Sequence, residues 1–445
     1  MVRGSGSRHQ SVIDPVGQPR VAGPVATTPA GLPHAGNGIT WSMLGVIVAQ
    51  LAQWAVIVLL SRLGTPEMVG QYALGLSVSA PIILLAGFAL RTVQVTDTGH
   101  LFSFNDYLRL RMSGMVVALV LIGVLAALVG EAHGVIVLLV GVAKALDAVG
   151  DIYWGLFQRH ERMRPIAISM MCNGLITIVA VVSLLMLTGS IKWAVVGSVV
   201  GSLVGSIGYC AWAAKPLGAA AWTAGVAHDV PPSDPLVALR RITRLAVIAA
   251  PLGIASGLVS LSVNLPRYFV EHVAGAAALG IFAALANVVL VANILFAALY
   301  QVLLPRLTWL SAAGDLSAFT TLTLKLVLGT LSCGAVAVAA VAAIGPVTVR
   351  VVYGSSYDGQ TTVLILLTVA AVLSGVVFFL NGALSALRRF GNQLIASLIM
   401  VAVAAVGGYL LVPRFGLIGG AWSVVITVGG DSLLKALLLK RALAK

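Results

Sequence analysis

The sequence predicts an all-α polytopic membrane protein with about 12 transmembrane helices. Apolar residues make up 59% of the 445 residues, and charged residues make up only 9%, against about 25% in an average soluble domain. Long runs such as Ala274–Leu304 and Val363–Leu387 contain no charged residue, and a helix needs about 20 apolar residues to cross the hydrocarbon. So few charges could not shield this much apolar surface from water.

The predicted spans form two sets of six, one in each half of the chain. The first set is Trp41–Ser61, Tyr72–Thr96, Ser113–Gly130, Val135–Phe157, Ile166–Thr188 and Trp193–Ala214. The second set is Leu245–Asn264, Leu279–Val302, Leu326–Val349, Val363–Leu387, Leu394–Val412 and Leu417–Leu439. We therefore expect a disordered cytoplasmic tail over 1–40, an N-terminal six-helix lobe over 41–214, a cytoplasmic linker over 215–244 and a C-terminal six-helix lobe over 245–445.

The distribution of basic residues predicts the orientation in the membrane. Net charge is +13, but most of the Lys and Arg residues fall in the segments that lie on the same side as the N-terminus. The opposite loops hold Arg62, Lys192, Arg267, Arg350 and Arg414. This imbalance is the positive-inside pattern and predicts that both termini are cytoplasmic. Anionic membrane lipids are therefore the expected partners of the basic excess, and nucleic acid is not.

The second half of the chain echoes the first. Gly70-Gln71-Tyr72-Ala73 aligns with Gly280-Ile281-Phe282-Ala283. Arg159, Trp193 and Gly201 recur, at one constant offset, as Arg388, Trp422 and Gly430. Because six spans are an even number, such repeats run parallel and are related by an axis along the membrane normal. The alternative is a shared rhythm of hydropathy without a common origin.

Three charged residues of the fourth span share one helix face. Lys144, Asp147 and Asp151 are spaced at i, i+3 and i+7. A charge at mid-bilayer costs about 2.5–3.5 kcal/mol, so such residues usually face a bundle interior or a cavity. One hypothesis is an ion-coupling switch in which Asp147 or Asp151 exchanges a proton or a cation. The other is a self-neutralising Lys–Asp pair that packs the helix.

Five further polar residues are candidates for substrate binding. Arg91 lies in the second span, and Arg62 and Arg267 mark the outer ends of the first and seventh spans. A guanidinium suits phosphate because its planar fork donates two parallel hydrogen bonds. Asn264 and Asn287 offer amides that could bind sugar hydroxyls. Each Arg could instead anchor its helix at the interface, and each Asn could tie helices together.

Motifs of enzymes, cofactors and metals are missing from the sequence. It contains no P-loop, no His-containing metal pattern and no nucleophile elbow. Cys172, Cys210 and Cys333 lie within predicted spans and have no metal-ligand spacing. We therefore expect no enzyme activity, no cofactor and no metal. Energy for uphill transport would come from an ion gradient, from the membrane potential or from removal of the product.

Several short stretches together carry a resemblance to a known family. They are Leu63-Gly64 with Gly70-Gln71-Tyr72, Phe102 with Tyr107-Leu108 and Arg111, Asn264-Leu265-Pro266-Arg267-Tyr268, Leu279-Gly280-Ile281-Phe282, Tyr353-Gly354 with Tyr357, and Pro413 with Gly416-Leu417 and Gly419-Gly420-Ala421. From about Trp41 to the C-terminus the chain resembles the oligosaccharide-lipid flippases of the bacterial polysaccharide transporter family. Their superfamily also holds multidrug/toxin extruders and lipid II flippases.

The resemblance implies two six-helix lobes around a central cavity that opens alternately to each side. The first, second, seventh and eighth spans would line this cavity, with Arg91, Arg267 and Asn264 as candidate contacts. The implied substrate is a polyprenyl-diphosphate-linked glycan, which the protein would flip across the bacterial inner membrane for surface polysaccharide or lipopolysaccharide biosynthesis. Polysaccharide polymerase machinery would be a further partner. The alternative functions are an ion-coupled multidrug/cation antiporter of the same superfamily, a membrane-embedded glycan polymerase or ligase, and a non-transporting scaffold.

Overall fold

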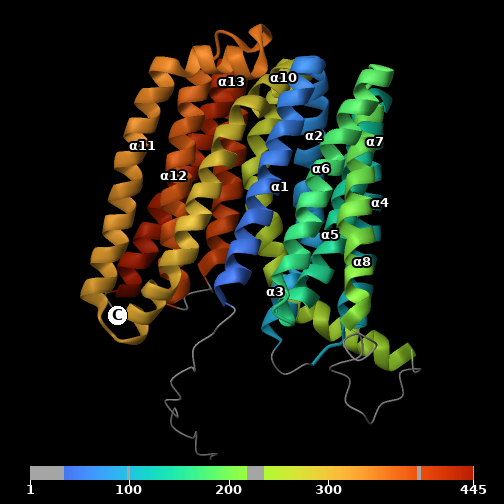
Figure 1. Cartoon of the computed structure of the whole chain (residues 1–445). Coiled ribbons are helices and arrows are strands. Elements are labelled where there is room, and N and C mark those ends of the chain that lie inside the picture. The colour runs from blue at the N-terminus through green and yellow to red at the C-terminus, as the bar shows by residue number, and fades with distance from the viewer. Residues whose placement is uncertain (1–34, 98–100, 218–234, 388–391, 444–445) are drawn as a thin grey trace, which may run out of the picture.

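A computed structural model describes residues 35–97, 101–217, 235–387 and 392–443, and these ranges are almost entirely helical (Figure 1). The helices of the first half are α1 (Ala35–Leu63), α2 (Pro66–Ala86), α3 (Leu90–Thr96), α4 (Phe104–Val129), α5 (Glu131–Arg159), α6 (Met163–Thr188), α7 (Ile191–Gly201), η1 (Ser202–Gly208), α8 (Tyr209–Ala214) and η2 (Lys215–Leu217). Those of the second half are α10 (Pro235–Ala312), α11 (Leu316–Tyr353), η3 (Ser355–Tyr357), α12 (Thr361–Ala386) and α13 (Asn392–Leu443).

The described helices account for the predicted number of membrane crossings. Nine helical stretches are long and apolar enough to span a membrane. Two of these each contain two crossings, because α10 turns at Gly275 (φ 82°) and α13 turns at Gly416 (φ 55°). Positive φ is a conformation that glycine adopts without a steric penalty, so it allows a reversal within a continuous helical stretch. Helix α5, which has 29 residues and is not among the nine, brings the described chain to about 12 crossings.

The helix boundaries extend beyond several of the predicted spans. Helix α1 already begins at Ala35, inside the segment expected to be a disordered tail, and residues 1–34 lie outside the described ranges. The expected linker over 215–244 is partly helical, since η2 covers Lys215–Leu217 and α10 begins at Pro235. Its middle, 218–234, also lies outside the described residues. Proline is well suited to the first position of a helix, because its missing N–H would be unpaired there in any case.

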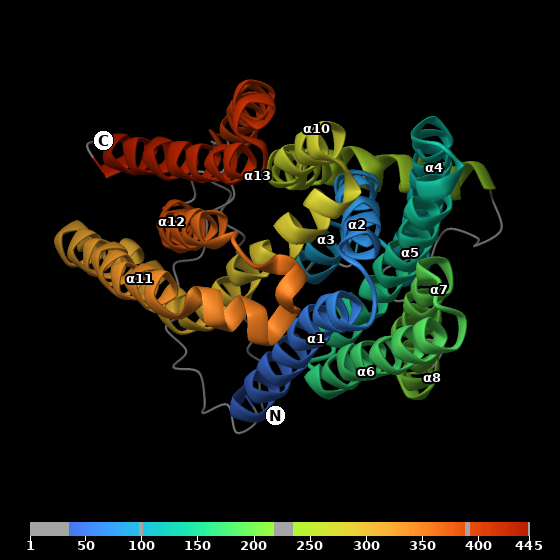
Figure 2. The same ribbon diagram turned by 90° about the horizontal axis from the view of Figure 1, so that it is seen from above.

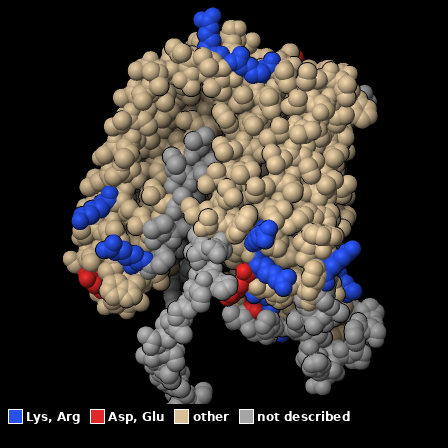
Figure 3. Space-filling model, in the orientation of Figure 1, with Lys and Arg blue, Asp and Glu red and all other residues tan. Residues whose placement is uncertain are grey.

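The helices gather into two groups when the bundle is viewed along its long axis (Figure 2). Helices α1 to α8 form one group, which we call the N-lobe, and α10 to α13 form the other, the C-lobe. Figure 3 shows Lys and Arg side chains at the lower end of the visible face and a smaller number at the upper end. The wide band between them contains almost no charge, as expected for a surface in contact with lipid.

The two lobes touch at Gly70 and Gly280, in the segments that the alignment of the two halves pairs. A Cβ added to Gly70 of α2 would overlap the carbonyl of Ala276, and a Cβ added to Gly280 of α10 would overlap the carbonyl of Pro66. Pro66 precedes Gly70 by the same interval as Ala276 precedes Gly280. The contact is therefore reciprocal, as it is across a two-fold axis. The second span of each lobe meets its counterpart there, and both glycines are needed for the close approach of the backbones.

This contact predicts a strong effect of side-chain size at Gly70. We expect Gly70→Leu to lower the free energy of unfolding by about 1–3 kcal/mol, because the added side chain forces the two lobes apart. Reversible unfolding in mixed micelles measures the change. Gly123→Leu on α4 is the matched control, since a Cβ at Gly123 meets nothing within 4 Å. Equal stability of the two variants would contradict the tight lobe–lobe contact.

Candidate functional site

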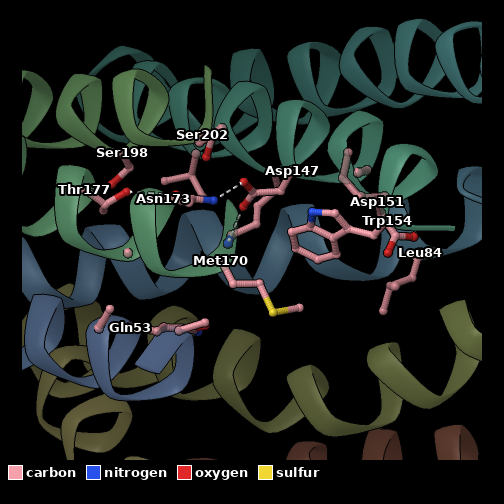
Figure 4. Close-up of a pocket in the computed structure, with 18 of the residues that line it drawn as sticks. Gln53, Leu84, Asp147, Asp151, Trp154, Met170, Asn173, Thr177, Ser198 and Ser202 are labelled. Atoms are coloured by element: carbon pink, nitrogen blue, oxygen red, sulfur yellow. Dashed lines mark hydrogen bonds and ion pairs between the residues drawn. The ribbon is translucent and has the colours of Figure 1, made fainter. Parts of the chain in front are cut away.

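The N-lobe encloses a cavity of about 460 Å³. Its wall is built from α1, α2, α4, α5, α6, α7 and η1, and α10 of the C-lobe contributes Ser256. Much of the lining is apolar, but one side carries a concentration of polar groups (Figure 4). The polar residues of the whole lining are Gln53, Tyr72, Arg111, Lys144, Asp147, Asp151, Asn173, Thr177, Ser198, Ser202 and Ser256. Figure 4 shows Gln53 on α1, across the cavity from Asp147 and Asn173.

Asp147 is the centre of one hydrogen-bond network in this wall. Lys144 Nζ lies 3.1 Å from Asp147 Oδ2, and the other carboxylate oxygen accepts from Asn173 Nδ2 at 2.8 Å and from Ser206 Oγ at 3.0 Å. Thr177 Oγ1 donates to Asn173 Oδ1 at 3.1 Å and so orients the amide. Figure 4 shows the Asn173 amide pointing directly at the Asp147 carboxylate. The ion pair is thus fixed by donors from two neighbouring helices.

The π-helical turn η1 supplies one of these donors. Helix α7 changes from α to π geometry at Ser202, and the segment returns to α geometry at Tyr209. A π turn inserts one extra residue per turn and is common at functional sites. Gly205 packs against the backbone of Asn173, so η1 lies close to α6 at this level. That approach lets Ser206 Oγ donate to Asp147 and accept from Asn173 Nδ2.

Asp151, one helical turn further along α5, binds two arginines. Arg91 Nη1 lies 3.2 Å from Asp151 Oδ1, and Arg111 Nη2 lies 3.3 Å from Asp151 Oδ2. Arg91 also donates to Gln158 Oε1 through Nε and Nη2, at 3.2 and 3.1 Å. Its guanidinium lies 5.5 Å from the ring centroid of Trp154, a cation–π distance. Two cations therefore share one carboxylate at this end of the cavity.

A break in the second span positions Arg91. Helix α2 ends at Ala86, and α3 starts at Leu90 after Phe88 and Ala89, which have φ values of 54° and 46°. Positive φ costs a non-glycine residue free energy of the order of 1–3 kcal/mol, and such strain is often found at functional sites. Two glycines of neighbouring helices pack against this break. Gly114 of α4 contacts the carbonyl of Ala86, and Gly253 of α10 contacts the backbone of Phe88.

Arg111 is a site residue that the predicted third span, Ser113–Gly130, left just outside its start, whereas helix α4 begins before it. Its side chain lies within α4, is only 5% exposed and lines the cavity. Helix α4 starts at Phe104, well before the predicted span, because Ser103 and Asp106 form a capping box. The pattern Ser-x-x-Asp is visible in the sequence and marks a helix start. It would have placed Arg111 inside the helix.

Several other lining residues were missed, although the sequence contained a signal for them. Asn173 and Thr177 are spaced at i, i+4 in an otherwise apolar span, and serines recur every fourth residue in the next span at Ser198, Ser202 and Ser206. Spacings of four residues put side chains on one helix face. Polar groups that recur on one face of a membrane helix indicate a protein interior or a cavity rather than lipid.

The candidate substrate residues do not all come together. Arg91 joins Asp151 at the cavity, whereas Arg267 and Asn264 form a separate pair on α10, with Arg267 Nη1 at 3.0 Å from Asn264 Oδ1. Within the described part of the chain, Arg267 has no acidic partner within salt-bridge distance. Asn287 is buried and donates to the carbonyl of Ala284 at 3.2 Å. A role of these residues in binding stays a prediction.

Arg62 connects the two lobes at the upper end of the bundle. Its guanidinium donates to the carbonyls of Val352, at 2.9 Å, of Arg350, at 3.4 Å, and of Val351. These carbonyls belong to the last turn of α11, and that of Arg350 also accepts from the backbone N–H of the cap residue Gly354 at 3.1 Å. A cation at a helix C-terminus, where carbonyls lack partners within the helix, is favourable. Nearby, Trp54 Nε1 donates to Tyr353 Oη at 3.2 Å. We call these two contacts the upper latch.

Comparisons with known proteins agree with this geometry. The family described as "Polysaccharide biosynthesis protein" matches residues 35–311. A capsular polysaccharide biosynthesis protein of Staphylococcus aureus, CapF, is 23% identical over 383 residues, which cover 86% of this chain and 93% of that protein.

Solved structures show the same architecture. An inward-facing multidrug resistance MATE family transporter of the MOP superfamily has a TM-score of 0.70 at 14% identity, covering 91% of this chain and 98% of that one. The lipid II flippase MurJ, in an inward closed conformation, has a TM-score of 0.69 at 11% identity, covering 91% of this chain and 89% of that one. The chain therefore has the two-lobed, twelve-helix fold of these multi-pass membrane proteins.

The upper latch predicts how easily the bundle opens at its upper end. Arg62→Gln removes the guanidinium that joins α1 to α11, so we expect the upper end to open more often. A cysteine placed at Gln53 in the cavity, in a chain without its native cysteines, should then react several times faster with an impermeant maleimide added on that side. Lys192→Gln is the control, an exposed basic residue at the same end of the N-lobe. Unchanged labelling in Arg62→Gln would show that the latch does not restrain opening.

Proposed function

This chain belongs to the polysaccharide biosynthesis protein family, and from that premise we propose that it flips a polyprenyl-diphosphate-linked oligosaccharide across the bacterial inner membrane by alternating access. The lower end of the bundle would face the cytoplasm, with both termini there, as the positive-inside pattern predicts. The glycan would serve surface polysaccharide biosynthesis. The lipid tail would remain in the bilayer while the diphosphate and the sugars pass between the lobes.

The observation that supports this proposal best is the positive charge at the cavity. Arg91 and Arg111 share the single carboxylate of Asp151, and Lys144 is balanced by Asp147. Arg111, Lys144, Asp147 and Asp151 line the cavity, and Arg91 adjoins it through its contact with Asp151, so these five described groups together leave one cation in excess. A diphosphate would complement that excess, and guanidinium groups bind phosphate oxygens with short, charge-assisted hydrogen bonds. The serine, threonine and amide groups of the wall would suit sugar hydroxyls.

The same charges argue against a transporter of cationic drugs. Such a substrate would need a carboxylate free to pair with it, and both Asp147 and Asp151 already bind cationic side chains in the described structure. The antiporter remains the alternative function because MATE transporters share the fold. Resistance assays in an efflux-deficient host test it directly. Increased resistance without any glycan export would replace our proposal by the alternative.

Arginine substitutions test substrate binding. We expect Arg91→Ala and Arg267→Ala each to reduce export of the glycan by about tenfold or more, because each removes a charged donor for phosphate. Surface polysaccharide and protein abundance are measured together. Arg109→Ala is the matched control, since Arg109 lies on α4 near Arg111 but is exposed. Full export by both test variants at normal abundance would remove the assigned binding role.

Asp147 and Asp151 are proposed as the ion-coupling residues, with Lys144 as the cation that pairs with Asp147. We expect Asp147→Asn and Asp151→Asn to abolish the dependence of transport on an imposed ion gradient, since an amide does not exchange a proton at neutral pH. Transport into proteoliposomes with and without the gradient measures this. Asp431→Asn in the C-lobe is the control, because Asp431 is likewise paired with a lysine, Lys435, at 2.7 Å. Gradient dependence that persists in both test variants would reduce these carboxylates to a structural role.

A further inference from the structure

Asp151 is held in an unusual way for a carboxylate between two arginines. Each guanidinium contributes a single nitrogen, Nη1 of Arg91 at 3.2 Å and Nη2 of Arg111 at 3.3 Å. The strongest arginine–carboxylate geometry is bidentate, with two parallel N–H···O bonds shorter than these. The carboxylate therefore bridges the two guanidinium groups but binds only one nitrogen of each. An anion with more oxygen atoms would use the same two cations more completely.

Asp147 provides the contrast. Its carboxylate is fixed by Lys144, Asn173 and Ser206, which come from three different segments. Among the described residues, the hydrogen bonds to Asp151 come from Arg91 and Arg111 alone. The side chains of Asp151 and Asp147 are about equally exposed, at 28% and 25%, so the difference between them lies in their partners. Of the two carboxylates, Asp151 is the one whose described partners are both guanidinium groups, which a second anion can also bind.

Both arginines keep further donors for a larger anion. Arg111 is only 5% exposed, and its Nε has no hydrogen-bond partner among the described residues. A buried donor without a partner is unfavourable, so an acceptor that reached it would be stabilised. The remaining donors of Arg91 bind the neutral amide oxygen of Gln158, which an anionic oxygen can replace. Trp154 lies under the guanidinium and keeps it oriented.

We propose that Asp151 is a built-in competitor of the substrate, an internal anion that occupies the Arg91–Arg111 site until a diphosphate displaces it. Each phosphate group of the diphosphate would bind one guanidinium. When the carboxylate swings back, it would expel the diphosphate and so assist release after the lobes have moved. This inference rests on the proposed function, since it names the group of the substrate that binds this site and the residue that regulates its binding.

Binding of inorganic pyrophosphate tests the competition. The purified full chain in detergent is titrated by calorimetry at fixed ionic strength, without divalent cations. We expect Asp151→Asn to bind pyrophosphate about tenfold more tightly than the wild type, because the amide does not compete for the arginines. Asp151→Glu restores a carboxylate and should return the affinity toward that of the wild type. Asp431→Asn, which removes a paired carboxylate from the other lobe, controls for the change in net charge.

Two outcomes would overturn the inference. In the first, Asp151→Asn binds pyrophosphate no more tightly than the wild type. In the second, the tighter binding persists when Arg111→Gln is added, which would place the anion elsewhere. If Asp151→Asn does not fold, as judged by gel filtration and thermal melting, Asp151→Ser is titrated with the same criteria. If the wild-type protein flips the lipid-linked glycan but Asp151→Asn binds pyrophosphate no more tightly, only the competitor role of Asp151 is refuted. If Asp151→Asn binds pyrophosphate more tightly but the wild-type protein does not flip the glycan, the proposed function is refuted.

Discussion

The pairing of charges along α5 is the interaction on which the N-lobe depends. A lone charge inside a bilayer is costly, so each ionisable group needs partners, which come from α5 itself in the Lys144–Asp147 pair and otherwise from neighbouring helices. Asp147 draws Asn173 of α6 and Ser206 of η1 toward it, and Asp151 draws arginines from α3 and α4. The same contacts that neutralise α5 therefore bring four neighbouring segments together around one cavity. The contacts of Asp147 and Asp151 thus account both for the packing of these helices and for the polar groups in the cavity wall.

The lobes meet along α2 and α10, whose buried side chains belong to one hydrophobic core. Glycines on α2 and α10 let two backbones touch, and the upper latch joins α1 to α11 by donors to the end of a helix. Hydrogen bonds from a charged donor contribute less when the donor is exposed to water, as Arg62 is. The two lobes therefore share a buried apolar seam along α2 and α10, and the upper latch adds a few polar contacts to it. A movement of one lobe against the other would have to take place along this packed seam.

The spans could be predicted because lipid imposes a simple rule, namely about 20 apolar residues per crossing. The face of α5 that carries Lys144, Asp147 and Asp151 followed from helical spacing, and all three line the cavity. Helical spacing did not predict the partners of these residues on other helices. Arg111 lies on another helix, and its pairing with Asp151 depends on how α4 and α5 pack. Likewise, nothing local in the sequence relates Arg62 to carbonyls of α11, some 290 residues away.

The reciprocal contact of Gly70 and Gly280 has a consequence for the origin of the chain. A surface that matches its own copy across a two-fold axis is what a homodimer uses. A six-span unit that carried this surface could pair with an identical unit inserted in the same orientation, because an even number of crossings returns both ends to one side. Duplication and fusion of one gene would then preserve an interface that already existed, and each half could afterwards acquire its own polar residues, as α5 has done.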